Sequence, residues 1–412
     1  MAKRIGVLTA GGDAPGQNVC LKAMVANAVD RGYEVIGIRK GWEGLMRIDP
    51  NSPTTQTDHA MVLSKPRVRD IDRTPGSFLH SSRVDPAHVN SSSAPIFLRP
   101  HEETDQLLDL TDHVKRAVET LKLDALILLG DNFSLNYAAR LNREGVPVVG
   151  IPKTVHNDVH GSDYSLGFST ALANGVRIVN DFRAMVGSRE EIAVIEVVGR
   201  SFGLTTTLIS VLAGADRLLI PEVPFDPEKL ALLLLEDKRS NPASYAILAM
   251  SEAVSLDPEK LSRYMPELSR LASSRALAEA TQSAGQGLTP DLIIYDLAQD
   301  LGARVGSNSA VVTEVLQNLT GQRVLFQSLS YLIRTGLPDG QDLLGALNFA
   351  RMAVNLVDTG QTGRMVAYRR GDNYVDVPID TVSEREGNIN VAEFYDAVNY
   401  RAKPDILWAA RI

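Results

Sequence analysis

The sequence predicts an α/β protein in which parallel strands alternate with helices. Short apolar runs rich in β-branched residues recur along the chain, and most are separated by stretches with the spacing of amphipathic helices. The runs are continuously apolar rather than alternating, as expected for parallel strands that helices cover on both faces. At about 150 residues per domain, the 412 residues are enough for two to three domains.

The strands and helices can be placed by these patterns. The predicted strands are Ile5–Thr9, Glu34–Ile38, Ala125–Leu129, Val148–Ile151, Ile192–Val198, Arg217–Ile220, Tyr245–Met250 and Asp291–Tyr295. Helices are predicted at Gln17–Arg31, Asp105–Leu121 and Ser134–Arg143. The segment Asp49–Arg99, rich in Ser, Pro, Thr and Arg, is expected to be a loop long enough to reach over a site. Breaks are expected at Asn241-Pro242 and at Gln282–Pro290.

Composition excludes several classes of protein. The 50 acidic and 42 basic residues give a net charge of -8 without a dense basic block, which argues against nucleic-acid binding. The single cysteine, Cys20, indicates a reducing compartment and argues against structural zinc. The apolar run Leu230–Leu235 is far shorter than the roughly 20 residues of a membrane span. Together with the absence of a signal-peptide pattern, this predicts a cytoplasmic protein that contacts neither membrane nor nucleic acid.

Ligands of open parallel sheets bind beyond the carboxyl ends of the strands, so the residues after each strand are the candidate site. After the first strand, Gly11 and Gly12 precede a helix N-terminus, a combination that suits a phosphate. The alternative is that the two glycines only turn the chain. The loop fits neither the Walker pattern nor Gly-x-Gly-x-x-Gly, so a different phosphate loop is predicted.

The densest junction is Lys153–Asp158, directly after a predicted strand. It supplies a cation, a hydroxyl, an imidazole, an amide and a carboxylate, which together can position a phosphate, accept a proton and hold a metal. A histidine at such a place is alternatively structural. Three further junctions carry charged or polar groups: Gly130–Ser134, Glu196–Arg200 and Ile220–Asp226.

These segments resemble the phosphofructokinase family, from Lys3 to about Ala367. The similar motifs are Gly11-Gly12-Asp13-Ala14-Pro15-Gly16-x-Asn18, Ser77 to Arg83, Pro152-Lys153-Thr154 to Asp158, Val198-Gly199-Arg200, Pro221 to Asp226, and Arg334-Thr335-Gly336-Leu337-Pro338-Asp339. Lys153 and the residues around Arg334 are most similar to the bacterial branches that include pyrophosphate-using members.

The resemblance implies two similar α/β lobes with parallel, helix-flanked sheets and a site in the cleft. Residues 1–152 would form a donor-binding lobe, residues 153–345 a sugar-phosphate-binding lobe, and residues 346–412 a C-terminal crossing segment. It further implies a homodimer or homotetramer that acts in glycolysis. The implied reaction is magnesium-dependent transfer of a phosphoryl group from ATP or pyrophosphate to fructose 6-phosphate or a related sugar or polyol.

The resemblance also implies roles for individual residues. Donor phosphates would contact Gly11, Gly12, Arg83, Asp131, Asn132, Phe133 and Ser134. The sugar phosphate would contact Thr154, Gly199, Arg200, Glu222 and Arg334. Lys153, Thr154 and His156 would be catalytic, and Asp131 and Asp158 would hold Mg²⁺. The alternatives are surface ion pairs for Arg200 and Arg334 and a helix cap for Glu222.

Two positions of the site depart from the family pattern. His156 stands where the family has an aspartate base, and a neutral imidazole can accept a proton near pH 7. In the donor loop, an ungapped count places the metal-binding carboxylate on Asn132 and the donor-discriminating position on Phe133. A shift of one residue places that carboxylate on Asp131. Phe133 would fill the donor site, stack on a purine or pack in the core.

A third departure concerns the arginines that a neighbouring subunit lends to the sugar phosphate in this family. The first position falls on Glu191, with Arg189 nearby, and Arg323 lies near the second. These changes leave a second function open, a non-catalytic subunit that binds a nucleotide or sugar phosphate and regulates a partner. A dinucleotide-dependent oxidoreductase is disfavoured because the glycine fingerprint is absent.

Overall fold

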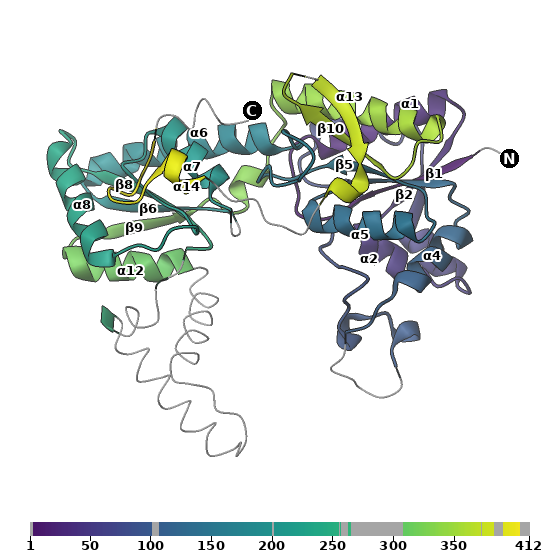
Figure 1. Cartoon of the computed structure of the whole chain (residues 1–412), viewed down its shortest axis with the longest axis horizontal. Coiled ribbons are helices and arrows are strands. Elements are labelled where there is room, and N and C mark those ends of the chain that lie inside the picture. The colour runs from purple at the N-terminus through teal and green to yellow at the C-terminus, as the bar shows by residue number, and fades with distance from the viewer. Residues whose placement is uncertain are drawn as a thin grey trace, which may run out of the picture. The chain divides into compact units, whose positions relative to one another are not determined.

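The computed structural model describes residues 3–100, 107–199, 202–254, 256, 263–264, 308–371, 373–382 and 390–403. The chain forms two compact units (Figure 1). The first comprises Met1–Ala173, Ile333–Gly387 and Arg411–Ile412, and the second comprises Asn174–Leu332 and Asn388–Ala410. Each unit contains a mainly parallel sheet flanked by helices, which confirms the predicted fold class.

The first unit is built on a seven-stranded sheet of order β11-β10-β5-β4-β1-β2-β3. Its strands are β1 (Arg4–Thr9), β2 (Glu34–Ile38), β3 (Ala60–Leu63), β4 (Ala125–Gly130), β5 (Val148–Pro152), β10 (Arg364–Arg369) and β11 (Asn373–Pro378). The edge strands β3 and β11 are antiparallel and the others are parallel. The chain leaves β1 toward β2 and returns to β4 on its other side, so a topological switch point lies between β1 and β4.

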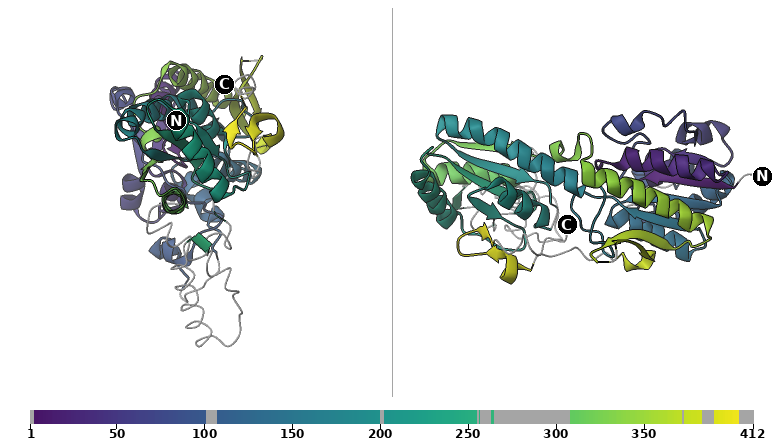
Figure 2. Two further views of the ribbon diagram at one scale, coloured as in Figure 1. Left: turned by 90° about the vertical axis from the view of Figure 1, so that its left-hand side faces the viewer. Right: turned by 90° about the horizontal axis from the view of Figure 1, so that it is seen from above.

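Helices cover both faces of this sheet. Helices α1 (Gln17–Asp30) and α13 (Gly340–Asp358) lie side by side on one face (Figures 1 and 2). Helices α2 (Gly41–Met46), α4 (Thr111–Thr120) and α5 (Asn132–Arg143) cover the other face. On that face Leu8 and Leu128 of the sheet join one buried cluster with Trp42, Val114 and Leu135 of the three helices. Burial on both faces explains the continuously apolar strands.

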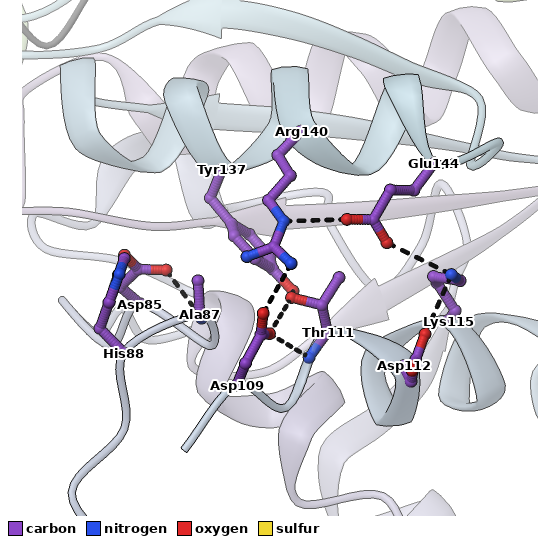
Figure 3. A network of polar contacts seen from close by, with 10 residues as sticks. All are labelled: Asp85, Ala87, His88, Asp109, Thr111, Asp112, Lys115, Tyr137, Arg140 and Glu144. Atoms are coloured by element: carbon purple, nitrogen blue, oxygen red, sulfur yellow. Dashed lines mark hydrogen bonds and ion pairs between the residues drawn. The ribbon is translucent and has the colours of Figure 1, made fainter. Parts of the chain in front are cut away.

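A polar network joins α4 to α5 at the surface (Figure 3). Asp109 accepts hydrogen bonds from the backbone N–H of Thr111, at 3.0 Å, and from Arg140 Nη2, at 2.6 Å. Arg140 also pairs with Glu144 at 2.9 Å, and Lys115 pairs with Glu144 at 3.2 Å. The hydrogen bonds from Thr111 and Arg140 hold the pKa of Asp109 below its usual value despite partial burial. The network fixes α5, whose first turn belongs to the candidate site.

The second unit contains a four-stranded parallel sheet of order β7-β8-β6-β9. Its strands are β6 (Ile192–Val197), β7 (Arg217–Leu219), β8 (Ala246–Ser251) and β9 (Val324–Ser328). The helices are α7 (Leu204–Ala213), α8 (Pro227–Ser240), α12 (Asn308–Thr320) and most of α6 (Phe168–Arg189), which begins in the first unit. Leu234 of α8 and Val312 of α12 share one buried cluster with Leu248 of β8.

The last described residues anchor to β7. They form α14 (Val391–Phe394), β12 (Tyr395–Asp396) and β13 (Arg401–Ala402). Arg217 of β7 pairs with buried Asp237 at 2.5 Å, and Arg401 reaches the same carboxylate at 2.8 Å. Tyr395 donates its hydroxyl to the carbonyl of Leu218 at 2.7 Å.

Several bounds differ from the sequence-based expectations. The first unit continues past residue 152 to Ala173, because Leu166 folds back and bridges to Lys153 beside β5. Residues 333–387 return to the first unit, and residues 388–410 to the second. The expected loop Asp49–Arg99 contains α3 (Pro53–His59), β3 and three short 3₁₀ helices, η1 (Ile71–Arg73), η2 (Ser91–Ser93) and η3 (Ile96–Leu98).

The helix expected at Asp105–Leu121 begins only at Thr111, where Asp109 accepts the first free N–H. Two short 3₁₀ helices, η4 (Leu332–Arg334) and η5 (Ile379–Thr381), complete the described elements. The predicted strand Asp291–Tyr295 and the predicted break Gln282–Pro290 lie outside the described residues. Among the described helices, none has the length and apolar character to cross a membrane.

Candidate active site

Gly11 follows β1 at the switch point and approaches the residue that follows β4. Its φ of +81° lies in the region that favours glycine, and a Cβ there would come within 2.5 Å of the Asp131 carboxylate carbon. Its N–H donates to the Ser82 carbonyl at 2.9 Å. Gly11 therefore contributes its conformation and a close approach to Asp131, while its own N–H is taken up by Ser82.

Gly12 lies among three cationic side chains. A Cβ at Gly12 would be 2.8 Å from Arg334 Nη1 and 3.2 Å from Arg83 Nη2. The Lys153 ammonium donates a hydrogen bond to the Gly12 carbonyl. In the described part of the chain, the N–H groups of Gly12 and Asp13 donate to no backbone group. Positive side chains and N–H groups without a backbone acceptor at one loop of the described chain are the chemistry that binds a phosphate.

The segment that carries Arg83 is fastened to the glycine loop and to α1. Ser81 Oγ donates to the Gly11 carbonyl at 2.6 Å. The Asn18 side chain accepts from the N–H of Phe78 and donates to the carbonyl of Thr74, both at 2.9 Å. These contacts give a structural reason for an asparagine at the start of α1, a role that the sequence left unassigned.

Lys153 directly follows β5 and is fully buried. Its backbone N–H donates to the Gly130 carbonyl at 2.9 Å, which continues the pairing of β5 with β4. Burial lowers the pKa of its ammonium to about 8, against the opposite effect of the Asp131 and Asp13 carboxylates. This cation therefore titrates close to physiological pH.

His156 and Arg334 contact each other in the first unit. Arg334 Nη2 lies 3.1 Å from His156 Nε2, and Arg334 Nη1 donates to the Asp13 carbonyl at 3.4 Å. A guanidinium can only donate hydrogen bonds, so His156 Nε2 must be the acceptor. That nitrogen cannot take a proton from a substrate hydroxyl while the contact persists. Arg334, which the resemblance places at the sugar phosphate, lies here beside the donor loop.

The backbone of Thr154 is held by Leu166, where the chain folds back beside β5. The N–H of Thr154 donates to the Leu166 carbonyl at 3.1 Å, and Thr154 Oγ1 accepts from the N–H of His156 at 3.1 Å. Asp158 follows in the same loop and is half-buried. The backbone of the segment Pro152–Thr154 is thus fixed on both sides of Lys153.

Asp131 caps α5, and its position bears on the two alignments of the donor loop. Asp131 Oδ1 accepts from the N–H of Ser134 at 3.1 Å and from Ser134 Oγ at 2.8 Å. Asn132 is buried in the first helical turn, and Phe133 is 54% exposed. The carboxylate beside Gly11 favours the shifted alignment, with Asp131 as the metal-binding candidate. The exposure of Phe133 contradicts the core-packing alternative.

In the second unit, two of the predicted sugar-phosphate residues, Gly199 and Glu222, form hydrogen bonds at the two ends of the segment between β6 and α7. The N–H of Gly199 lies 3.3 Å from Glu252 Oε1. Glu222 Oε1 accepts from the N–H of Gly203, the residue before α7, at 3.0 Å, so Glu222 has the capping contact given as its alternative. Arg200 lies outside the described residues. The sequence analysis did not single out Glu252. It is the second residue after the predicted strand Tyr245–Met250, so the rule that site residues follow strands would have found it.

Glu191 forms an ion pair with Arg323 inside the second unit. Glu191 Oε1 lies 3.6 Å from Arg323 Nη1, and the Glu191 side chain is only 12% exposed. The first position that the resemblance marks for a lent arginine therefore carries a negative charge that faces Arg323, the residue near the second position. Arg323 supplies a cation near these positions, but the Glu191 carboxylate compensates its charge.

No group of three or more His, Cys, Asp or Glu side chains in the described ranges could hold a metal ion by itself. Magnesium commonly takes one or two carboxylates and completes its shell with water and substrate phosphates. Asp131 at the glycine loop fits such a partial site, and Asp158 is the second candidate in the loop after β5.

Comparison with known proteins relates this chain to a protein family. The family model described as Phosphofructokinase matches residues 4–357. The pyrophosphate–fructose 6-phosphate 1-phosphotransferase of Dictyoglomus thermophilum is 31% identical over 398 residues, which cover 96% of this chain and 97% of the relative. An ATP-dependent 6-phosphofructokinase of Chloroflexus aurantiacus is 30% identical over 391 residues, covering 94% and 92%.

Solved structures show the same fold. The pyrophosphate-dependent phosphofructokinase of Marinobacter aquaeolei superposes with a TM-score of 0.69 at 16% identity, over 98% of this chain and 89% of that one. The corresponding protein of Nitrosospira multiformis gives a TM-score of 0.70 at 15% identity, over 100% and 91%. With a family match across most of its length and relatives of this similarity, the chain belongs to the phosphofructokinase family.

Proposed function

We propose that the protein is a magnesium-dependent phosphotransferase that moves a phosphoryl group from ATP or pyrophosphate to fructose 6-phosphate. The relatives are named for this reaction, one with pyrophosphate and one with ATP as donor. The observation that carries the proposal is the convergence of Arg83, Arg334 and Lys153 on Gly12. Such a constellation has little use in a protein that binds no polyanion.

The donor phosphates would bind to this cluster. Phosphoryl transfer passes through a loose transition state, so positioning and charge neutralisation supply most of the catalysis. The cluster supplies positive charge, and the N–H groups of Gly12 and Asp13 supply donors at fixed positions. Mg²⁺ held by Asp131, with Asp158 as second candidate, would neutralise further charge on the donor.

The sugar phosphate is assigned to the residues of the second unit that follow β6, β7 and β8. By resemblance these are Gly199, Arg200 and Glu222, to which the hydrogen bond to Gly199 adds Glu252. The roles of Thr154 at the acceptor and of Phe133 beside the donor stay predictions, and so do a cytoplasmic location and a homodimer or homotetramer. The names of the relatives favour an enzyme over the non-catalytic regulatory subunit.

Arg83→Ala tests the donor site. We expect magnesium pyrophosphate or magnesium ATP, whichever the natural chain binds, to bind about tenfold more weakly, on the order of 1.4 kcal/mol. The cause is the loss of one charge-assisted contact between the Arg83 guanidinium and a donor phosphate. Isothermal titration calorimetry measures the affinity, and Arg116→Ala on the exposed side of α4 is the matched control. Equal affinities in the natural chain and in Arg83→Ala would contradict the assignment.

A further inference from the structure

We propose that His156 is a positioning residue, whose neutral imidazole holds the Arg334 guanidinium against Gly12 as part of the donor-phosphate site. The inference rests on the proposed function, because it names a determinant of the same site. It replaces the expectation that His156 is the general base.

The first step is the location of Arg334. The side chain is largely buried, at 9% exposure, and its Nη1 lies 2.8 Å from the position that a Cβ of Gly12 would take. Arg83 Nη2 lies 3.2 Å from the same position, and Lys153 donates to the Gly12 carbonyl. Arg334 thus belongs to one cluster of positive charge with Arg83 and Lys153.

The second step is what holds a guanidinium in a cluster of like charges. Such a group needs hydrogen-bond acceptors, and Arg334 meets the Asp13 carbonyl at 3.4 Å and His156 Nε2 at 3.1 Å. His156 is itself buried, and its N–H is tied to Thr154 Oγ1 at 3.1 Å. The imidazole therefore presents its acceptor nitrogen from a fixed backbone.

The third step concerns charge. An imidazolium would carry a proton on Nε2 and could not accept from Arg334, so the contact requires the neutral ring. A carboxylate at this position would also accept from Arg334, but it would compensate the positive charge in an ion pair. The neutral ring orients the guanidinium toward the donor phosphates without placing a negative charge beside it.

Variants of His156 separate positioning from base catalysis. The side-chain carbonyl of His156→Gln can reach Arg334 as an acceptor but cannot act as a base near neutral pH. His156→Leu removes both functions, and Arg334→Met removes the partner. His59→Gln, in α3 and outside the site, is the matched histidine control. Thermal denaturation of each full-length variant verifies that it is folded.

We expect His156→Leu to weaken magnesium pyrophosphate or magnesium ATP binding by at least about tenfold, as Arg334→Met does. The double variant should bind no more weakly than Arg334→Met, because the two residues act through one contact. His156→Gln should keep donor affinity within about threefold and keep turnover of the same order. Unchanged donor affinity in His156→Leu, or loss of turnover in His156→Gln equal to that in His156→Leu, would overturn the proposal.

Nuclear magnetic resonance of the ¹⁵N-histidine-labelled protein supplies a readout that packing alone would not change. The His156 ring is expected as the tautomer protonated on Nδ1, with Nε2 unprotonated, and Arg334→Met should alter the Nε2 signal. A proton on Nε2 in the free protein would refute the contact. Donor affinity and tautomer are both measured without turnover, so failure of this inference is distinguishable from absence of phosphotransferase activity.

Discussion

Donor affinity is expected to fall as the pH rises through about 8, because the buried ammonium of Lys153 loses its proton in that range. A bound polyanion favours the charged lysine, so binding above this pH takes up a proton. The affinity should decrease by up to about tenfold per pH unit until the pKa of the complex is reached. Calorimetry in buffers of different ionisation enthalpy measures both the affinity and the proton uptake.

The stability of the free protein should change in the opposite direction. A lysine whose pKa is lowered by folding destabilises the folded state while it is protonated, and the penalty is relieved as the pH rises from about 8 toward its ordinary value. Lys153→Met is therefore expected to leave the free chain at least as stable. It should lower turnover by roughly 10²-fold or more, as loss of one preorganised charge does in other enzymes.

Lys153→Arg is the matched variant for the pH effect, because an arginine stays protonated throughout. The decrease in affinity above pH 8 should disappear in this variant, whatever its absolute affinity. A decrease that persists unchanged in Lys153→Arg would show that another group titrates, and the assignment to Lys153 would be wrong.

Asp342→Ala is expected to lower the free energy of unfolding by about 3 kcal/mol, since several buried donors lose their acceptor together. Asp342 is fully buried near the start of α13. Its carboxylate accepts from the Tyr164 hydroxyl, from the N–H of Gly167 at 2.6 Å, and from the N–H and hydroxyl of Thr170, the N–H at 2.9 Å. Chemical denaturation monitored by circular dichroism measures the change.

Turnover should also fall in this variant, because the same contacts fix the backbone around Lys153, to which we assign a role in the transfer. Gly167 adjoins Leu166, whose N–H and carbonyl bond to Pro152 and Thr154 on either side of Lys153. Asp358→Ala, at the other end of α13 and paired with Arg31 at 3.5 Å near the surface, is the control and should cost about 1 kcal/mol or less. Equal losses of stability in the two variants would contradict the role of Asp342.

The strands that build the site were predictable because burial on both faces leaves a continuous apolar signal. The run Glu34–Ile38 forms β2 with the predicted bounds, and the other predicted strands within the described residues differ by one residue at one or both ends. Strand β9 was not predicted. The antiparallel edge strands β3 and β11, the strand β10 beside β11, and the short helices between Asp49 and Arg99 carry weaker signals. The parallel pairing of β10 joins it to β5, more than 200 residues earlier in the chain, and local pattern does not encode such a contact.

The site was predictable in its members but not in its contacts. Strand ends indicated Gly11, Asp131 and Lys153, which the fold brings together at the switch point. The contact between His156 and Arg334 joins residues 178 positions apart, so no local sequence pattern could predict it. The same distance in sequence separates Asp342 from Tyr164.

The most direct test of the phosphotransferase assignment is ³¹P nuclear magnetic resonance of the purified chain with Mg²⁺ and fructose 6-phosphate. ATP and pyrophosphate are supplied in separate reactions. With at least one donor, we expect fructose 1,6-bisphosphate to accumulate as the donor is consumed, and Lys153→Met to suppress this transfer. A folded chain that binds the donor but forms no bisphosphate with either would contradict the account.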